Sequence, residues 1–587
     1  MRLDAGFERG SDAEQQQTAN IGPRATGDER RLEERRDLLT RSPYTPSRMS
    51  PKRPLQIGAG LAILLAGSSI VLFWLFGSGE STAAATSTTI PAGSTTEPSI
   101  TPTTAGTSTS EATTSTTSTT LVPLHEWVDR RTVGEPWGTQ VEGLITFRGN
   151  PTNTYYGEGP VPDTPTQAWR YPESPMCSQS TDLGVTTTWC GNGWTGQPII
   201  YERDDGVTEM IFGAYDRKLH FVDAHTGIKT RSAFATGDII KGTPTLDPDG
   251  YPIVYFGSRD NKLRALALDR GEPAEIWSFE VCIRGDACPP ESATVHNAGQ
   301  WNDDFDASPR IVNDILFEGA ENGWYYIWKL NRGYDSVGLV TIEPVLLFSM
   351  QTYDDELLAR VAPSGYPAIS VENTTAIYEG RAYFANSAGR VVGLDITNIE
   401  NGEAPIVFDY WVGDDVDASI VIDADGYIYV SAEYERYFQR AQDLGQLIKL
   451  DPYDRDGDGD PWVWGMYSLT NPPAKGGLWS TPALGDGVLY AVTNKGFLVV
   501  VDQETGEEVA VLQLAPGSWS SPAVVGTDLV VAAQDGALRK YDISDPRNPR
   551  LDWTWVIGSH LESTPAVWKG MIYVGSRDGF MYAIGDQ

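Results

Sequence analysis

Four aspartates lie close together in the segment DPYDRDGDGDPW. Asp454, Asp456 and Asp458 alternate with other residues, and Asp460 follows the second glycine. Carboxylates in this alternation converge when a loop coils around an ion, glycine permits the sharp turns, and Ca²⁺ accepts about six to eight oxygen ligands. The twelfth position holds a glycine instead of the bidentate glutamate of an EF-hand. The segment therefore predicts a calcium site of modest affinity, and an acidic surface turn is the alternative.

A second polar cluster lies in the segment WNDDFDASPR. Its candidate ligand residues are Trp301, Asn302, Asp303, Asp304 and Asp306. If this segment enters an inner strand of the fold, its carboxylates face a central channel, where a cation or a sugar can bind beside the tryptophan. The alternative is that these aspartates and asparagines only end strands and cap turns.

The four cysteines fall into two pairs along the chain. Cys177 and Cys190 have 12 residues between them, and Cys282 and Cys288 have 5. Neither spacing is the CxxC of a zinc or thioredoxin site. We expect two local disulfides, which form in an oxidising compartment outside the cytoplasm. Four buried thiols are the alternative.

The remaining composition excludes several classes of function. The sequence contains no HExxH, GxSxG or P-loop motif, so hydrolase and P-loop nucleotide chemistry lack their usual signatures. The formal net charge is −35, and the acidic excess falls wholly after the first 54 residues, which hold 11 basic and 9 acidic residues. Such a surface repels nucleic acid and anionic lipid, whereas cations and basic proteins are attracted to it.

An uncharged apolar stretch predicts how the chain is placed in the cell. Residues 55–76 contain no charged side chain and are long enough to span a bilayer as a helix. Basic residues precede the stretch, and the first charge beyond it is Glu80. The positive-inside rule then places residues 1–54 in the cytoplasm and the remainder outside. A cleaved signal peptide is the alternative to a retained signal-anchor.

Composition divides the rest of the chain into three parts. Residues 1–54 are polar and poor in aromatics, which predicts a disordered tail. Residues 77–121 form a tract rich in Ser, Thr and Pro, which predicts an extracytoplasmic stalk. Residues 122–587 have the composition of one large globular domain.

The globular part repeats one unit. The unit is Ser/Thr-Pro, a short apolar strand, a Gly/Asp turn, a β-branched strand, a second turn and a third strand, and after Asp502 a fourth strand follows. Clear copies span 242–269, 479–506, 519–546 and 562–585, and weaker copies begin near Gln197, Ser308, Tyr366 and Ser419. Eight such units predict an all-β fold, an eight-bladed β-propeller of four-stranded antiparallel blades.

The last unit stops after its third strand. The strand-like segment TQAWRYPE, residues 166–173, stands near the start of the domain. We expect it to supply the missing outer strand and so to close the ring without a covalent bond.

The repeated STPA…VYVGS.DG.LYALD unit and the opening FRGNPTNT resemble those of PQQ-like, or quinoprotein dehydrogenase-like, propellers. The resemblance covers about residues 143–587, and residues 301–335 are similar to membrane-anchored actinobacterial members. It implies the propeller fold but not one function. Such repeats occur in quinone-dependent dehydrogenases and in cofactor-free proteins, including the propeller lipoprotein of the outer-membrane barrel-assembly machinery.

The dehydrogenases of this group hold the quinone between a tryptophan and a disulfide of two adjacent cysteines, with Ca²⁺ beside it. No two cysteines are adjacent here. We therefore expect a non-enzymatic, membrane-anchored module outside the cytoplasm, which binds a protein or a cell-envelope glycan and which Ca²⁺ stabilises. The alternative is an oxidoreductase that depends on the quinone PQQ or on a metal and acts on alcohols or sugars.

Overall fold

The computed structural model of this chain describes residues 128–586, except 139, 183–184, 195, 282–303, 366–368, 467–475 and 515–516. The predicted tail, the 55–76 helix, the stalk and the Cys282–Cys288 pair lie outside the described residues. Within the described ranges, no helix is both long and apolar enough to cross a membrane. The membrane anchor therefore stays a prediction.

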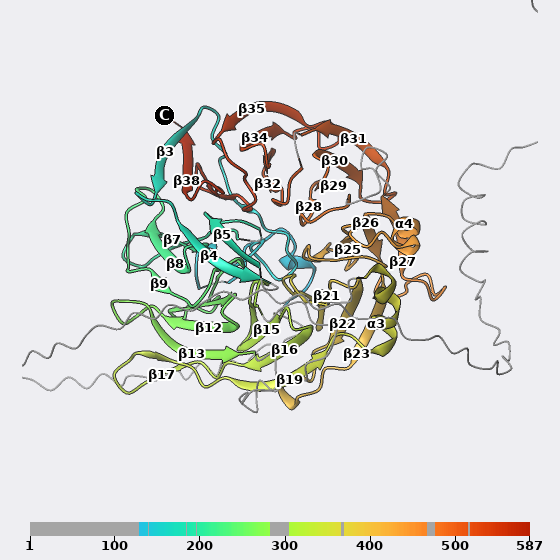
Figure 1. Cartoon of the computed structure of the whole chain (residues 1–587), viewed down its shortest axis with the longest axis horizontal. Coiled ribbons are helices and arrows are strands. Elements are labelled where there is room, and N and C mark those ends of the chain that lie inside the picture. The colour runs from blue at the N-terminus through green and yellow to red at the C-terminus, as the bar shows by residue number, and fades with distance from the viewer. Residues whose placement is uncertain are drawn as a thin grey trace, which may run out of the picture. The chain divides into compact units, whose positions relative to one another are not determined.

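Eight sheets follow one another along the chain and stand around a common centre (Figure 1), and their strands are antiparallel except where β2 joins β36. From the inner to the outer edge, blade 1 consists of β1 (Gly143–Leu144), β6 (Ile199–Glu202), β7 (Thr208–Ala214), β8 (Lys218–Asp223) and β9 (Phe234–Ala235). Blade 2 consists of β10 (Thr245–Leu246), β11 (Ile253–Ser258), β12 (Lys262–Ala267) and β13 (Ala274–Glu280). Blade 3 consists of β14 (Arg310–Val312), β15 (Ile315–Gly319), β16 (Trp324–Lys329) and β19 (Val345–Gln351), and blade 4 of β20 (Ala376–Tyr378), β21 (Arg381–Ala385), β22 (Arg390–Asp395) and β23 (Ile406–Trp411).

Blade 5 consists of β24 (Val421–Ile422), β25 (Ile428–Ser431), β26 (Leu447–Leu450) and β27 (Trp462–Met466), and blade 6 of β28 (Ala483–Leu484), β29 (Val488–Val492), β30 (Phe497–Asp502) and β31 (Glu508–Gln513). Blade 7 consists of β32 (Ala523–Val525), β33 (Asp528–Ala532), β34 (Ala537–Asp542) and β35 (Arg550–Val556). Blade 8 consists of β2 (Gly157–Glu158), β36 (Ala566–Trp568), β37 (Met571–Gly575), β38 (Met581–Asp586) and β3 (Pro165–Tyr171). The predicted all-β, eight-bladed propeller is confirmed.

A few elements stand outside the blades. They are the hairpin β4 (Cys177–Asp182) and β5 (Val185–Cys190), the pair β17 (Gly333–Tyr334) and β18 (Val340–Thr341), the helices α3 (Asp355–Val361) and α4 (Gln439–Leu444), and the short 3-10 helices η1 (Arg130–Thr132), η3 (Ala362–Ser364) and η4 (Ile399–Asn401). Cys177 and Cys190 face each other across the β4–β5 ladder and form a disulfide there, as their spacing predicts.

Burial along the strands explains why the sheets pack radially. Every residue of β11 is buried, whereas in β13 at the rim of the same blade only Phe279 is buried. A blade thus buries both faces of its middle strands only between two neighbouring blades, and apolar burial of this kind is the main source of stability. A bulge between the third and fourth strands recurs in blades 2 to 8 and adds twist.

Strand β3 closes the ring. It pairs antiparallel with β38, the last strand of the chain, with Trp169 opposite Ala583. The outer strand of blade 8 therefore comes from the start of the domain, which confirms the expected role of residues 166–173. The strand itself spans Pro165–Tyr171.

The Ser/Thr-Pro repeat has a structural role around the channel. In blades 1 to 7, a backbone N–H at the entry to the blade donates to the hydroxyl of the corresponding residue in the next blade. The bonds run from Gln197 to Thr243 (2.8 Å), Thr243 to Ser308 (3.2 Å), Ser308 to Thr374 (3.3 Å), Thr374 to Ser419 (2.9 Å), Ser419 to Thr481 (3.1 Å), Thr481 to Ser521 (3.0 Å) and Ser521 to Thr564 (3.3 Å). We call this ring the hydroxyl belt. A proline after the hydroxyl residue removes an N–H donor that the channel wall would otherwise have to satisfy.

The belt corrects one predicted boundary. Blade 4 was expected to begin near Tyr366, but its belt residue is Thr374 and its inner strand begins at Ala376. The segment before it carries α3 and η3, which lengthen the connection from blade 3. Blade 4 therefore begins later than the Tyr-Pro dipeptide indicates. The sequence pattern missed this start because Thr374 is followed by a second threonine instead of proline.

Residues 143–158, which we call the channel segment, run inside the ring and contact all eight blades. They add β1 to blade 1 and β2 to blade 8. In the blades between, their hydrogen bonds pair Ile145 O with Leu246 N, Phe147 O with Arg310 Nη2, Pro151 O with Ile377 N, Thr152 O with Ile422 N, and Arg148 with the carbonyls of Pro482 and Pro522. The opening FRGNPTNT motif therefore fills the channel and ties the blades together.

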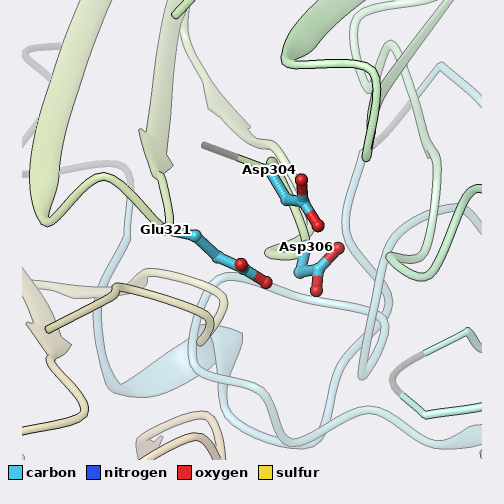
Figure 2. A group of neighbouring side chains, drawn as sticks. All are labelled: Asp304, Asp306 and Glu321. Atoms are coloured by element: carbon cyan, nitrogen blue, oxygen red, sulfur yellow. The ribbon is translucent and has the colours of Figure 1, made fainter. Parts of the chain in front are cut away.

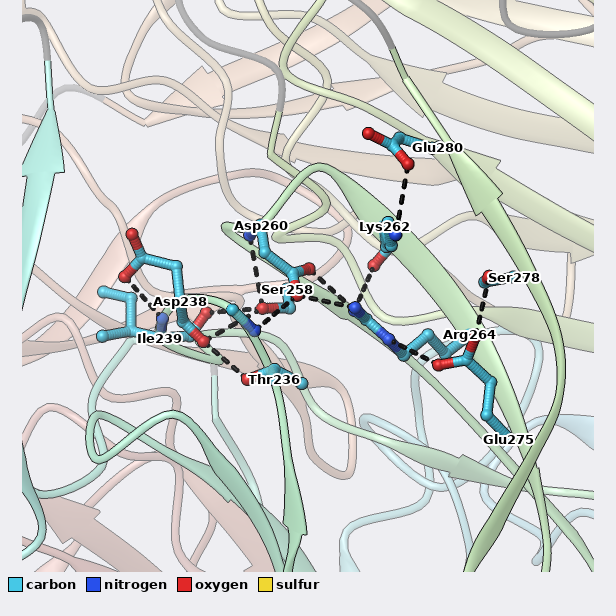
Figure 3. A network of polar contacts seen from close by, with 11 residues as sticks. Thr236, Asp238, Ile239, Ser258, Asp260, Lys262, Arg264, Glu275, Ser278 and Glu280 are labelled. Atoms are coloured by element: carbon cyan, nitrogen blue, oxygen red, sulfur yellow. Dashed lines mark hydrogen bonds and ion pairs between the residues drawn. The ribbon is translucent and has the colours of Figure 1, made fainter. Parts of the chain in front are cut away.

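The turns between second and third strands repeat a polar pattern as well. Figure 3 shows the turn of blade 2, where both carboxylate oxygens of Asp260 accept from Arg264, at 2.7 and 2.6 Å, and Arg264 also donates to Glu275. Asp535 and Arg539 form the same pair in blade 7. A turn aspartate therefore fixes the first residues of the third strand in more than one blade.

Candidate functional site at the channel mouth

Two kinds of loop meet at one end of the channel. In an antiparallel blade, the loop that enters the inner strand and the turn between the second and third strands lie at the same end. We call this end the channel mouth. Acidic side chains from the loops before β14 and β24, and from the turns after β15 and β25, form two groups there, one at blade 3 and one at blade 5.

The group at blade 3 consists of Asp304, Asp306 and Glu321, whose side chains point toward one another (Figure 2). One oxygen from each carboxyl lies within 4.8 Å of the others, and all three residues are buried. Two basic side chains accompany them. Arg259 pairs with Asp304, while the Lys241 ammonium pairs with Asp306 and lies 3.4 Å from Glu321 Oε1. Three buried carboxyls therefore share two cations.

This group contains part of the channel cluster that the sequence predicts. Asp304 and Asp306 lie at the channel mouth, where their carboxyls form ion pairs within the protein. Trp301, Asn302 and Asp303 lie outside the described residues. Ligand binding by this cluster stays a prediction.

The group at blade 5 consists of Asp415, Asp417 and Glu433, again with one oxygen from each within 4.8 Å of the others. Arg436 Nη1 lies 3.0 Å from Asp415 Oδ2. Glu372, from the loop that enters blade 4, lies close enough to raise the pKa of Asp417. This part of the mouth therefore holds four carboxyls beside one guanidinium.

Burial shifts the titration of these four carboxyls. It raises the pKa of Glu372 to about 8 and that of Asp415 to about 7. The pKa values of Asp417 and Glu433 lie well above the usual range, first because of burial and then because of the neighbouring carboxyls. Carboxyls in this state hold protons near neutral pH unless a cation compensates their charge.

The two groups occupy equivalent positions in their blades. The segments DDFDAS before β14 and DDVDAS before β24 end at belt serines and place their aspartates alike. In each blade the glutamate N–H donates to the backbone carbonyl of the first ligand aspartate, Glu321 to Asp304 and Glu433 to Asp415, both at 3.0 Å. The same backbone arrangement therefore holds both groups.

Tryptophans form the opposite wall of the mouth. The rings of Trp479 and Trp519 have centroids 4.2 Å apart, and Trp194 lies 6.1 Å from Trp479. Trp194 and Trp479 line a narrow hollow together with Asp417 and with Phe147 of the channel segment. Aromatic faces next to a carboxyl suit a cationic or partly apolar group.

The residues at the mouth do not fit the quinone of the dehydrogenases. The sequence has no adjacent cysteines, and the described disulfide lies in the β4–β5 hairpin. The hollow that Trp194, Trp479 and Phe147 line does not admit a sphere as large as a water molecule, so it has no room for fused rings. No step through the quinone follows from this arrangement.

The predicted calcium loop lies at the other end of the propeller, in the turn between β26 and β27. Asp454, Asp456 and Asp458 are exposed, and one oxygen from each lies within 4.8 Å of the others. These carboxyls already accept hydrogen bonds from backbone N–H groups of the loop. The Gly459 N–H donates to Asp454, the Asp458 N–H to Asp456, and the Asp460 N–H to Asp458. Asp460 accepts from the Trp462 N–H. Calcium binding by this loop stays a prediction.

Sequence reasoning missed Asp415, Asp417, Glu433 and Glu372. The DDVDAS segment that carries the two aspartates differs at one position from the DDFDAS segment at residues 303–308, and that likeness could have identified them. The glutamates carry no such local signal. Their loops meet only because the blades stand in a ring.

Comparisons with known proteins agree with this architecture. A family model described as outer membrane protein assembly factor BamB matches residues 450–579. A search of curated proteins found no match.

Among solved structures, the quinohemoprotein alcohol dehydrogenase of Comamonas testosteroni is 13% identical with a TM-score of 0.50, covering 79% of this chain and 83% of that chain. BamB from Moraxella catarrhalis is 11% identical with a TM-score of 0.34, covering 72% of this chain and 100% of that chain. Identities this low show the fold alone.

Proposed function

This chain is a PQQ-like propeller repeat protein, and we propose that it acts as a non-enzymatic binding module, held outside the cytoplasm by the 55–76 helix, that takes a partner protein at the channel mouth. One observation carries the proposal. Asp417 and the rings of Trp194 and Trp479 line one hollow, which Phe147 of the channel segment also lines. The mouth thus combines acidic and aromatic groups on loops that a rigid ring holds in place.

The chemistry of the mouth selects a basic segment of the partner. A guanidinium or ammonium group placed over the mouth gains from the faces of the tryptophans and from the neighbouring Asp417 carboxyl. The net charge of −35 attracts basic proteins over a longer range. A cell-envelope glycan is the other ligand that tryptophans and carboxyls suit, and the experiment separates the two.

The test is photocrosslinking in intact cells. A photoreactive residue replaces Trp519 at the mouth or, as a control, Leu551, which is 53% exposed on the outer strand of blade 7. We expect a protein adduct from position 519 only, and we expect Asp417→Asn to weaken it. Equal adducts from both positions, or binding only to purified envelope polysaccharide, would refute the protein-binding proposal.

The second candidate is an oxidoreductase, which the gathering of high-pKa carboxyls at the mouth favours. The purified 122–587 domain is incubated with alcohols or sugars and an electron-accepting dye, with and without added quinone and Ca²⁺. We expect no reduction of the dye. Reduction that disappears in Asp417→Asn would assign the protein to the oxidoreductases instead.

A further inference from the structure

The acidic groups of blades 3 and 5 differ in one decisive exchange. Lys241 stands two residues before the belt residue Thr243, and Glu372 stands two residues before the belt residue Thr374. Each of them lies in the loop that enters the preceding blade, blade 2 for the blade 3 group and blade 4 for the blade 5 group. The lysine that pairs with two carboxyls at blade 3 is therefore a glutamate at blade 5.

Each acidic group has one arginine that pairs with its first aspartate. Arg259 pairs with Asp304 at blade 3. At blade 5 Arg436 pairs with Asp415, and it also donates to the carbonyl of Ser387. The exchange of Lys241 for Glu372 therefore removes one positive charge from the blade 5 group and adds one carboxyl, and only Lys241 of the blade 3 group acts on that carboxyl from a distance.

Three carboxylate oxygens at blade 5 have no hydrogen-bond partner. They are Asp415 Oδ1, Asp417 Oδ1 and Glu433 Oε1, and all three atoms are buried. Glu433 is only 2% exposed and Asp415 only 7%. Since one oxygen from each carboxyl lies within 4.8 Å of the other two, these side chains converge on one point. Buried oxygens without a donor are costly, and a single cation is a partner that can contact all three at once.

We propose that Asp415, Asp417 and Glu433, with Glu372 beside them, form a binding site for a hard divalent cation, Ca²⁺, in the place that the Lys241 ammonium occupies at blade 3. A donor set made only of carboxylate oxygens suits such a cation, and water or backbone carbonyls supply the rest of its shell. This site is separate from the exposed 454–460 loop. It stands whether or not a partner protein binds at the mouth.

The test is calorimetric titration of Ca²⁺ into the metal-free 122–587 domain. Besides the weak binding predicted for the 454–460 loop, we expect binding at the mouth that Asp417→Asn with Glu433→Gln weakens by about tenfold or more. The matched control is Asp456→Asn with Asp458→Asn, which removes carboxylates from the loop at the other end and leaves the mouth site unchanged. Circular dichroism checks that each variant is folded.

A charge exchange gives the second measurement. Glu372→Lys copies the arrangement of blade 3, so we expect it to abolish Ca²⁺ binding at the mouth and to raise the melting temperature of the metal-free domain. The proposal is overturned if the parent domain binds no Ca²⁺, if the loop variant loses all binding, or if the binding that the loop variant retains survives both Asp417→Asn with Glu433→Gln and Glu372→Lys.

Discussion

The ammonium of Lys241 pairs with Asp306 and with Glu321, which come from two different loops of blade 3. Both carboxyls are fully buried, and the lysine side chain is 11% exposed. Removing one partner of a buried ion pair leaves an uncompensated charge and costs about 3–5 kcal/mol. We therefore expect Lys241→Met to lower the free energy of unfolding by about that amount in urea denaturation.

The control for this variant is Lys262→Met. Lys262 pairs with Glu280 at the partly exposed edge of blade 2. A pair of this kind contributes about 0–1 kcal/mol. Equal losses in the two variants would show that the blade 3 carboxyls do not depend on Lys241.

Stability of the metal-free domain should fall as the pH rises. The pKa of Glu372 is raised from 4.5 to about 8 by burial, then by Glu321, while Lys241 lowers it and Asp415 raises it further. A carboxyl with a raised pKa binds its proton more tightly in the folded state, so its contribution is full below about pH 4.5 and is lost as the pH rises through about 8.

The measurement is the melting temperature between pH 5 and pH 8.5 in the presence of chelator. We expect Glu372→Gln to flatten the decline, because glutamine does not titrate. Glu400→Gln, at an exposed ion pair with Lys329, serves as the control. A decline of the same steepness in Glu372→Gln would rule out this carboxyl as its source.

The channel segment depends on one buried arginine. Arg148 donates to the carbonyls of Pro482 in blade 6 and Pro522 in blade 7. Arg148→Leu leaves both carbonyls without this donor, and each unsatisfied group costs about 1–3 kcal/mol. We expect the free energy of unfolding to fall by about 2–6 kcal/mol in urea denaturation, and we expect no comparable fall for the exposed Arg131→Leu. No difference between the two variants would contradict the proposed tie.

The exposed loop should bind calcium weakly. If its dissociation constant is about 10⁻⁴–10⁻³ M, Ca²⁺ at about 1 mM stabilises the domain by about 0.4–1.4 kcal/mol. The comparison is made in the Glu372→Lys variant, in which the mouth site is already disabled. There we expect Asp456→Ala with Asp458→Ala to remove the rise in melting temperature that calcium causes by binding to the loop. A full rise in the combined variant would leave the loop as an acidic turn.

The anchor prediction concerns the ends of the 55–76 helix. Its basic N-terminal flank places residues 1–54 in the cytoplasm. We expect added protease to cleave this tail in inverted membrane vesicles and to spare it in intact cells. Cleavage in intact cells would reverse the topology.

Local sequence signals predict the blades better than they predict the site. The Ser/Thr-Pro repeat marks inner strands because its hydroxyls form the belt, and the boundary of blade 4 is missed where Thr374 lacks the proline. Asp304 stands in a conspicuous acidic segment, so it could be predicted. Glu372 and Glu433 meet only through the closed ring, from loops on different blades, and no pattern within one repeat brings them together.

The channel segment also constrains the order in which the domain can be completed. Its β2 strand pairs with β36, and β3 pairs with β38 at the end of the chain. Residues made first must therefore wait for those made last, so during synthesis or export the earlier blades stand with an unclosed apolar flank. Such intermediates are prone to aggregation. The incomplete propeller must therefore stay soluble until its last strand is made, although the closed ring no longer exposes the apolar flank.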